Sequence, residues 1–197
     1  NKANPEEIFR KHGGLLRMAE ALRLGINRYT LYSLLENGII EQVTRGVYRL
    51  AELPPINNPD LVTVALRYPD SVVCLVSALS YHEITTQIPH AVSIAVERNT
   101  RMPALDYPPL RVHRFSDKAY SSGIDEHMID GVPVKIYSPE KTIADCFKFR
   151  MKIGMDVVLE ALKLYNSRKK ADLGNLLRFG EICRVKNVMM PYLEVSL

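Results

Sequence analysis

The sequence predicts an α+β protein, with an N-terminal winged helix-turn-helix followed by a mixed sheet and a helical C-terminal part. Three observations predict this class. Helical patterns and two short strands around a glycine turn occupy the first quarter of the chain, a proline-rich segment follows, and strand patterns then give way to helical ones. We therefore expect one domain over residues 1–53, a stiff linker over 54–59 and a second domain over 60–197.

The first expected helix covers Pro5–Lys11. A proline suits the first helical turn, and the two glutamates that follow it suit the positive end of the helix dipole. The pair Gly13-Gly14 then breaks the chain. A second helix is expected over Leu16–Arg23, with an apolar face formed by Leu15, Met18, Ala19 and Leu22.

A third helix is expected over Arg28–Glu36. Gly25 suits the tight turn before this helix, Asn27 can cap its first turn, and Gly38 can end it. Its leucines, at positions 31, 34 and 35, repeat at helical spacing and are expected to face a small core. The polar and aromatic residues between them are then left outside.

Two short strands, Ile39–Thr44 and Val47–Leu50, are expected to form a hairpin around Arg45-Gly46. A recognition helix followed by a basic hairpin is typical of winged helix-turn-helix domains that bind the major groove of double-stranded DNA. The alternative is a small interaction domain of the same shape that binds no DNA. Tyr48 is expected in the core in both cases.

The candidate DNA-binding residues lie on the second helix, on the exposed side or at the cap of the third helix, and on the wing. Arg45 at the wing tip and Arg28 at the start of the recognition helix are the first candidates, because such side chains contact phosphates or base edges. The full set is Arg17, Asn27, Arg28, Tyr29, Thr30, Tyr32, Ser33, Thr44 and Arg45.

Positive charge is concentrated in two parts of the chain. The formal net charge is +4, and residues 1–50 contain eight Lys or Arg against five Glu. Residues 148–186 contain ten Lys or Arg against four Asp or Glu. Both excesses are compatible with a nucleic-acid surface. A possible basic patch in the second region comprises Lys148, Arg150, Lys152, Arg168, Lys169, Lys170 and Arg178.

The cysteine and histidine contents predict neither a metal site nor a disulfide framework. The three cysteines, at 74, 146 and 183, show no metal-binding spacing, and the five histidines are scattered. The N-terminus is polar, and the longest apolar run, Val72–Val76, is too short to cross a bilayer. We expect a cytoplasmic protein without cofactor, metal or membrane contact.

Strand and helix patterns alternate over the first half of the second domain. Asp60 can cap a helix over Leu61–Arg67. The further expected elements are a strand at Val72–Leu75, a helix from Ser77 to His82, strands at Ala91–Val96 and Leu110–Phe115, and a hairpin over Met128–Tyr137 that turns at Asp130-Gly131.

Helical patterns fill the rest of the chain. Ser138 and Pro139 form a good helix start, and the helix that they begin continues through Phe147. Lys141 and Asp145 are four residues apart on this helix and can form an ion pair. Further helices are expected over Met155–Ser167, Leu173–Cys183 and Val188–Val195. The order of the strands does not follow from these patterns.

Several segments, taken in order, resemble the AbiEi antitoxins, bacterial regulators encoded beside a nucleotidyltransferase-like toxin. In the first domain these are the Gly13-Gly14 break, the helix-turn-helix and the wing Thr44–Tyr48. In the second domain they are Ser77–His82, Gln87–Pro89, Ser93–Val96 and Ser138–Asp145, the last similar to the family's "SPE[RK]T-x-x-D" signature. The chain departs from the family at His82-Glu83, where a His-Gly pair is common, and at Glu97–Asn99, where relatives often carry a PRG-like turn.

The resemblance implies two activities. The winged helix would bind an inverted repeat in its own promoter, as a monomer or weak dimer that pairs on DNA, and would repress its own operon. The second domain would act as the antitoxin of a type IV toxin-antitoxin system, an abortive-infection defence against phage, with or without direct contact to the toxin. The basic patch would then meet DNA beside the operator, the toxin or the toxin's RNA.

Two other functions are alternatives to this one. The first is a solitary winged-helix regulator whose second domain senses a ligand or a protein partner. The second is an enzyme, which is disfavoured because no glycine-rich phosphate loop, paired carboxylates or triad spacing is evident. His82 and Glu83 invite a catalytic interpretation, but a structural hydrogen bond from a histidine at a helix end is expected. The signature residues Glu140, Lys141, Thr142 and Asp145 are likewise expected to be structural.

Overall fold

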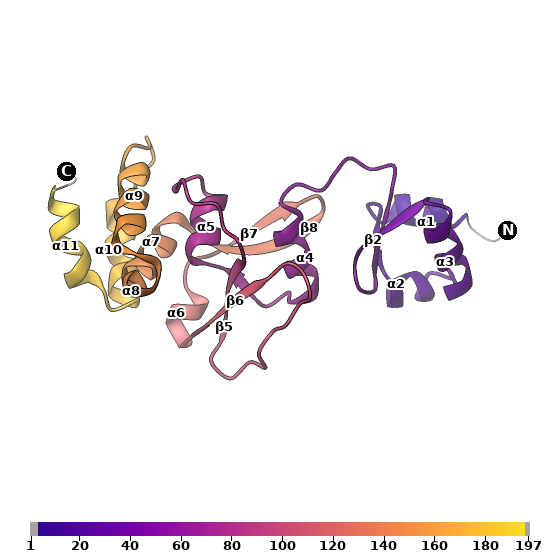
Figure 1. Cartoon of the computed structure of the whole chain (residues 1–197), viewed down its shortest axis with the longest axis horizontal. Helices are drawn as coiled ribbons and strands as arrows, with labels where there is room; N and C mark the ends of the chain where they lie inside the picture. The colour runs from indigo at the N-terminus through magenta and orange to yellow at the C-terminus, as the bar shows by residue number, and fades with distance from the viewer. Residues whose placement is uncertain (1–3, 196–197) are drawn as a thin grey trace. The chain divides into compact units, whose positions relative to one another are not determined.

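The computed structural model describes residues 4–195 and divides the chain into two compact units (Figure 1). The first unit contains the residues up to Pro59 together with the turn Ile129–Gly131, and the second contains the others from Asp60 onward. Helices and a three-stranded sheet build the first unit, and a five-stranded mixed sheet followed by helices builds the second. The predicted α+β class is confirmed.

Asparagine caps begin two helices of the first unit. Its helices are α1 (Pro5–Lys11), α2 (Met18–Arg23) and α3 (Arg28–Glu36). The side chain of Asn4 accepts a hydrogen bond from the Glu6 N–H at 3.2 Å, and that of Asn27 accepts from the Thr30 N–H at 2.8 Å. Each cap satisfies a backbone donor that the first helical turn leaves unpaired, as the sequence predicts at Asn27.

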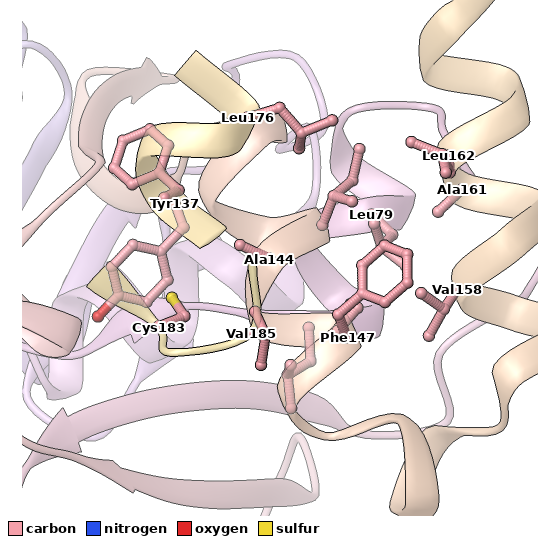
Figure 2. Packing of buried hydrophobic residues seen from close by; sticks show 14 of the residues in the cluster. Leu79, Tyr137, Ala144, Phe147, Val158, Ala161, Leu162, Leu176, Cys183 and Val185 are labelled. Atoms are coloured by element: carbon pink, nitrogen blue, oxygen red, sulfur yellow. The ribbon is translucent and has the colours of Figure 1, made fainter. Parts of the chain in front are cut away.

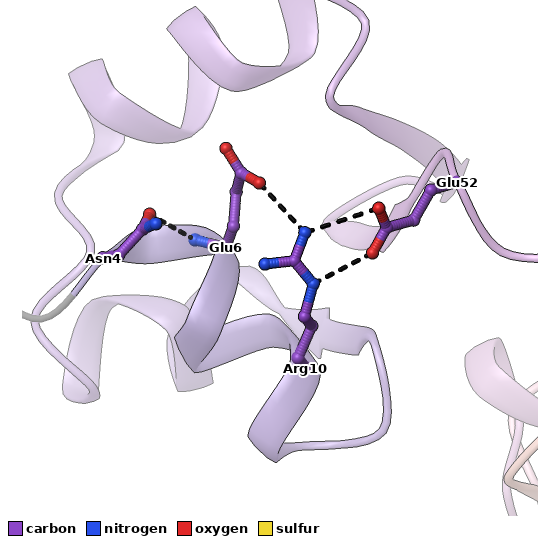
Figure 3. A network of polar contacts seen from close by, with 4 residues as sticks. All are labelled: Asn4, Glu6, Arg10 and Glu52. Atoms are coloured by element: carbon purple, nitrogen blue, oxygen red, sulfur yellow. Dashed lines mark hydrogen bonds and ion pairs between the residues drawn. The ribbon is translucent and has the colours of Figure 1, made fainter.

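An ion-pair network ties α1 to the chain that follows the wing (Figure 3). The guanidinium of Arg10 lies 3.1 Å from a carboxylate oxygen of Glu6 and 3.0 Å from one of Glu52. The hydrogen bond from Arg10 lowers the pKa of the Glu52 carboxyl. These side chains are largely exposed, so the network orients α1 but contributes little to stability.

The predicted second helix is wrong at its start. Leu15–Arg17 forms strand β1, and α2 begins only at Met18. β1 pairs antiparallel with β3 (Val47–Leu50), and Leu16 lies opposite Tyr48 in this pairing. The first unit therefore has a third strand that the helical pattern concealed.

Two glycines explain why the chain is extended before α2. Gly13 and Gly14 both have positive φ, and a Cβ on Gly14 would lie 2.5 Å from the Cδ1 atom of Leu53. The chain thus leaves its turn close against the sheet rather than in a helix. The predicted apolar face is also wrong, because Ala19 and Leu22 are exposed whereas Ala21 is buried.

The wing hairpin forms as predicted. β2 (Ile40–Thr44) pairs antiparallel with β3 around the turn Arg45-Gly46, with an irregularity between Gln42 and Thr44. The sheet order is β1-β3-β2. Tyr48 is 3% exposed, as expected for a core residue. The buried core of this unit comprises Phe9, Leu16, Ala21, Ile26, Leu31, Ile40, Tyr48 and Leu50.

The second unit contains a mixed sheet whose central strands are the most apolar. Its strands are β4 (Val72–Val73), β5 (Val92–Glu97), β6 (Leu110–Phe115), β7 (Ile124–Ile129) and β8 (Val132–Tyr137), in the order β6-β5-β4-β8-β7. β4 runs antiparallel to β5 and parallel to β8, and β5 runs parallel to β6. β7 and β8 are joined at Asp130-Gly131, as the sequence predicts.

The helix expected from Ser77 to His82 begins earlier than predicted. Helix α5 (Leu75–Tyr81) begins two residues earlier, after Cys74. The Ser77 hydroxyl accepts a hydrogen bond from the Ser93 N–H at 2.8 Å and donates to the Ala91 carbonyl at 3.3 Å. It therefore attaches α5 to β5, a long-range role that the local pattern cannot show.

Helix α7 lies at the centre of the helical part of the second unit (Figure 2). This helix, Pro139–Lys148, packs against α5, α9 (Met155–Asn166) and α10 (Leu173–Ile182), and it buries Ala144 and Phe147 among side chains of these helices. The remaining helices are α4 (Pro59–Arg67), α6 (Asp117–Ser121), α8 (Arg150–Ile153) and α11 (Lys186–Val195). The short helices α6 and α8 were not predicted. Within residues 4–195, no helix has the length and apolar character that a membrane span requires.

Candidate nucleic-acid interface

Helix α3 divides its side chains between core and solvent. Leu31 is buried, and Leu34 and Leu35 are partly buried against the same core. On the opposite side Tyr29 is 85% exposed, and Tyr32, at the edge of that side, is 48% exposed. A DNA major groove is wide enough to admit an α-helix, so this exposed side has the shape that groove recognition requires.

The polar candidates on α3 differ in how much of their hydrogen-bonding capacity is still available. Asn27 uses its side-chain oxygen to cap the helix, which leaves only its amide donors for a partner. The Asn37 amide donates to the Ser33 carbonyl at 2.8 Å and to its hydroxyl at 3.3 Å. Arg28 and Tyr29 are exposed, and neither side chain forms a hydrogen bond with the described residues. These two side chains are therefore the most available to a DNA partner at the start of the helix. Thr30 is half-buried and is less available.

Three further candidates come together at the turn end of the small sheet. Arg17 and Thr44 lie opposite Val47 on its two sides, and Arg45 follows directly in the turn. Arg17 thus lies on β1 rather than on the second helix, where the sequence placed it. Arg17 and Arg45 are exposed and Thr44 is half-buried. Two exposed guanidinium groups at one end of a wing suit contacts to backbone phosphates.

Arg49 is a cation of the first unit that faces inward. It is 5% exposed, and its guanidinium donates to a Glu41 carboxylate oxygen at 2.8 Å and to the Pro54 carbonyl. Glu41 and Arg49 are register partners on β2 and β3, so the pair holds the two wing strands together. In the sequence Arg49 contributes only to the excess of positive charge. Its pairing with Glu41 depends on the register shift between Gln42 and Thr44, which no local pattern indicated.

The second unit carries its signature residues in the interior. Lys141 and Asp145 on α7 are 0% and 1% exposed, and the Lys141 Nζ lies 2.6 Å from an Asp145 carboxylate oxygen. Burial raises the pKa of Asp145, and the Lys141 ammonium acts in the opposite direction. The Cys183 thiol donates to the other carboxylate oxygen at 3.2 Å. Both carboxylate oxygens therefore have a partner, which is the condition for a tolerable buried charge.

Aromatic rings and a close backbone complete the surroundings of Lys141. Its Nζ lies 4.0 Å from the ring centroid of Tyr137 and 5.0 Å from that of Phe115. A Cβ on Gly123, whose φ is +74°, would lie only 2.7 Å from the Lys141 Cβ. Only glycine fits at this point, because the positive φ and the close approach both exclude a side chain.

The other signature residues also have structural partners. The Ser138 hydroxyl accepts from the Lys141 N–H at 3.2 Å, and the Thr142 hydroxyl donates to the Tyr137 carbonyl at 3.2 Å. The Glu140 carboxylate accepts from the Tyr165 hydroxyl at 2.6 Å, which joins α7 to α9. These contacts provide a structural account of the signature, as the sequence analysis favoured.

His82 occupies the C-terminal cap of α5 and makes the structural hydrogen bond that was expected. Its Nε2 donates to the Tyr137 carbonyl at 2.7 Å, and burial lowers its pKa. The rings of Tyr81 and His127 pack against each other with centroids 4.9 Å apart, beside His82. The neighbouring Glu83 is exposed. The contacts of His82 in the described part of the chain are therefore structural.

The basic residues of the second unit are distributed over both ends of α9. Lys148, Arg150 and Lys152 precede this helix, and Arg168, Lys169 and Lys170 follow it. The helix has 12 residues, so its ends are separated by about 18 Å. Arg168 is also engaged, because its guanidinium donates to the His82 carbonyl. Arg178 lies on α10, with its guanidinium 5.2 Å from the Phe179 ring centroid.

Metal sites and cavities are the two other kinds of site that a chain of this kind can carry. No group of three or more His, Cys, Asp or Glu side chains within residues 4–195 could hold a metal ion. A cavity of about 410 Å³ lies in the second unit beside the C-terminal end of α4. Its lining includes the charged residues Arg67, Asp70 and Glu97 and the rings of Tyr68 and Tyr120.

Comparison with known proteins finds a family match for most of the first unit. Residues 5–51 match the family model described as a transcriptional regulator, AbiEi antitoxin, and this range spans α1 through β3. No curated protein sequence is significantly similar to the chain. Among solved structures, the RV2827C protein from Mycobacterium tuberculosis is similar with a TM-score of 0.56, at 13% identity over 96% of this chain and 79% of that one. At this identity the likeness shows a shared fold.

The family match and the geometry agree on the same segment. The matched residues contain the exposed side of α3, the wing tip at Arg45 and the core that holds them in place. The chain therefore carries, from α1 through β3, the N-terminal domain of the AbiEi family of antitoxins and transcriptional regulators.

Proposed function

We propose that the chain is a bacterial antitoxin that also represses its own operon by binding an inverted repeat in its promoter. The observation that carries the proposal is the exposed side of α3 next to a wing with exposed arginines, within the segment that matches the regulator family. In this arrangement α3 enters the major groove, and Arg28 at its start approaches base edges or phosphate. Arg17 and Arg45 at the wing contact phosphates or the neighbouring minor groove.

Two protomers are needed for useful specificity. The exposed side of a nine-residue helix reads only a short half-site, and a single wing adds few contacts. Two copies on an inverted repeat double the number of base contacts without a stable dimer in solution. We therefore propose a monomer or weak dimer that pairs on its operator.

The antitoxin activity belongs, in this proposal, to the second unit. The family description supplies the antitoxin role, and the resemblance supplies the partner, a nucleotidyltransferase-like toxin of a type IV phage-defence system. The exposed basic residues on either side of α9 are the candidate surfaces for the toxin, its RNA or flanking DNA. Expression of residues 57–197 together with the toxin tests this division, because protection by that fragment would locate the activity there.

A gel shift tests the DNA-binding half. The full chain is mixed with DNA from directly upstream of its own gene, at physiological salt and with scrambled competitor. A discrete shift that resists the competitor supports the autorepressor, because charge alone would not discriminate between the two sequences. The absence of any specific shift would contradict it and would move the function to protein or RNA contacts of the second unit.

A second candidate function rests on the cavity in the second unit. A volume of about 410 Å³ is within the range of small-molecule sites, and its lining mixes charged and aromatic side chains. In this alternative the chain is a solitary regulator whose second unit senses a ligand. An operator affinity that changes when a small-molecule library is added, and that no longer changes in Arg67→Ala, would favour it over the antitoxin.

A further inference from the structure

The exposed side of α3 is aromatic and almost uncharged. Among its nine residues, Arg28 is the only Lys or Arg and Glu36 is the only acid, and the helix contains no Asn or Gln. Arg and Lys are the usual readers of guanine, and Asn and Gln are the usual readers of adenine. Beyond Arg28, this helix therefore lacks the side chains that read purines by paired hydrogen bonds.

The two exposed tyrosines are the largest side chains that α3 offers to a partner. Tyr29 is 85% exposed, on the side opposite the buried Leu31, and Tyr32 is 48% exposed at the edge of that side. Residues three apart lie on one face of a helix and are separated by roughly 4.5 Å along its axis. Neighbouring bases of one strand are about 3.4 Å apart along the DNA axis, so the two rings can reach adjacent base pairs.

The remaining polar groups on α3 compete weakly for base contacts. The Ser33 hydroxyl already accepts from the Asn37 amide, and the Asn27 side-chain oxygen caps the helix. An aromatic ring in the major groove has one apolar feature to contact, the C5-methyl group of thymine. Burying a methyl against a ring excludes water from both, and this selects thymine over cytosine.

We propose that α3 reads thymine methyl groups in the major groove through Tyr29 and Tyr32, so that each half-site of the operator requires thymine at one or two positions. The proposal rests on the proposed DNA-binding function and adds the chemical feature that is recognised. In this proposal Arg17, Arg28 and Arg45 provide affinity for the DNA backbone, whereas the two tyrosines determine which base is preferred.

The test begins with a binding site found without assuming the promoter. Full-length protein selects duplexes from a random-sequence pool, and the enriched half-site is expected to contain thymine at one or two fixed positions. That duplex is then made with 2′-deoxyuridine in place of those thymines, which removes the methyl groups and leaves every hydrogen-bonding group unchanged. The dissociation constants of both duplexes are measured by fluorescence anisotropy at one salt concentration.

The wild-type protein is expected to bind the uracil duplex about fourfold more weakly for each lost methyl, the factor expected for one buried methyl-sized group. The double variant Tyr29→Ala/Tyr32→Ala should bind both duplexes equally, whereas Tyr29→Phe/Tyr32→Phe keeps the rings and should still discriminate. Arg45→Ala should weaken binding to both duplexes by the same factor. Ile88→Ala, at an 81% exposed residue of the second unit, should leave both affinities unchanged.

The outcomes separate the two claims. If a sequence is enriched but the thymine and uracil duplexes bind equally, the methyl proposal is wrong and DNA binding stands. If discrimination survives in Tyr29→Ala/Tyr32→Ala, with a circular dichroism spectrum like that of the wild type, the assignment to these tyrosines is wrong. If no sequence is enriched, the proposed DNA-binding function fails, and the methyl proposal fails with it.

Discussion

The two units place their most conspicuous polar residues in opposite environments. In the first unit, the side chains of Arg28 and Arg45 are exposed and form no hydrogen bond with the described residues. In the second, Lys141 and Asp145 are almost fully buried and paired with each other. A polar cluster in a sequence therefore has two meanings, and burial decides between them: exposed, unengaged groups are available to a partner, whereas buried, satisfied ones hold the fold.

This contrast predicts that substitutions in the two units have different consequences. An exposed arginine contributes little to stability, since surface changes usually alter it by less than about 0.5 kcal/mol. A buried pair behaves otherwise, because removal of one partner leaves an uncompensated charge in the interior. Substitutions of the exposed arginines in the first unit should therefore lower DNA affinity and leave stability almost unchanged. Substitutions of the buried pair in the second unit should lower stability.

The largest effect is expected for Asp145→Ala. It removes the partner of the buried Lys141 ammonium and should destabilise the second unit by about 3–5 kcal/mol. Urea denaturation followed by circular dichroism measures this loss. The double variant Lys141→Met/Asp145→Leu replaces both charges with apolar groups of similar size and should recover most of the stability. A single variant as stable as the wild type would show that the pair does not hold α7 in place.

Gly123→Ala should have the next largest effect. The new Cβ would lie 2.7 Å from the Lys141 Cβ at a φ of +74°, so conformational strain of about 1–3 kcal/mol is joined by a steric clash. Gly131→Ala is a matched control, because its φ is +79° but nothing lies within 4 Å of the new atom. The two unfolding free energies give the cost of the clash by difference. Equal losses would mean that the close approach to Lys141 is unimportant.

Arg45→Ala should weaken operator binding severalfold or more, since charged contacts to DNA are worth on the order of 1–3 kcal/mol. Its unfolding free energy should stay within about 0.5 kcal/mol of the wild-type value. Arg101→Ala removes one exposed cation of the second unit that lies outside the candidate surfaces, and it serves as the control. Anisotropy titrations at several salt concentrations measure both variants, and a wild-type affinity in Arg45→Ala would refute the position of the wing on DNA.

The smallest effect concerns acid sensitivity. Burial lowers the pKa of His82 below its ordinary value of 6.5, so the folded state resists a proton that the unfolded state accepts. The stability contributed by the neutral imidazole is present above that ordinary value and is lost as pH falls through the lower folded-state pKa. His82→Gln keeps a donor for the Tyr137 carbonyl and should flatten this decline between about pH 7.5 and about pH 5.5. An unchanged pH profile of the unfolding free energy in His82→Gln would contradict this origin.

The elements that local chemistry specifies were predictable from the sequence. The Asn27 cap, the leucine spacing of α3 and the Asp130-Gly131 turn each depend on residues that are close along the chain. Strand β1 was missed because its three residues become a strand only by pairing with β3, some 30 positions later. Its short apolar pattern fits a helix equally well.

The residues of the candidate site likewise divide into those that local sequence predicts and those that depend on distant parts of the chain. The exposure of Tyr29 follows from helical periodicity, which places it opposite the leucines. Tyr32 lies at the edge of the same exposed side and is accordingly less exposed. The inward position of Arg49 does not, because it depends on the opposition of Glu41 across the hairpin and on the Pro54 carbonyl. The burial of Lys141 depends on Gly123 and on rings from other elements, so no local pattern could show it.

DNase I footprinting on DNA upstream of the gene tests the central claim, that the first unit reads DNA through α3 and its wing. The account predicts that the full chain protects two inverted half-sites. Arg28→Ala/Arg45→Ala should lose this protection, and Arg101→Ala, at an exposed residue outside the candidate surfaces, should retain it. The absence of a protected region, or an unchanged footprint in Arg28→Ala/Arg45→Ala, would contradict the account.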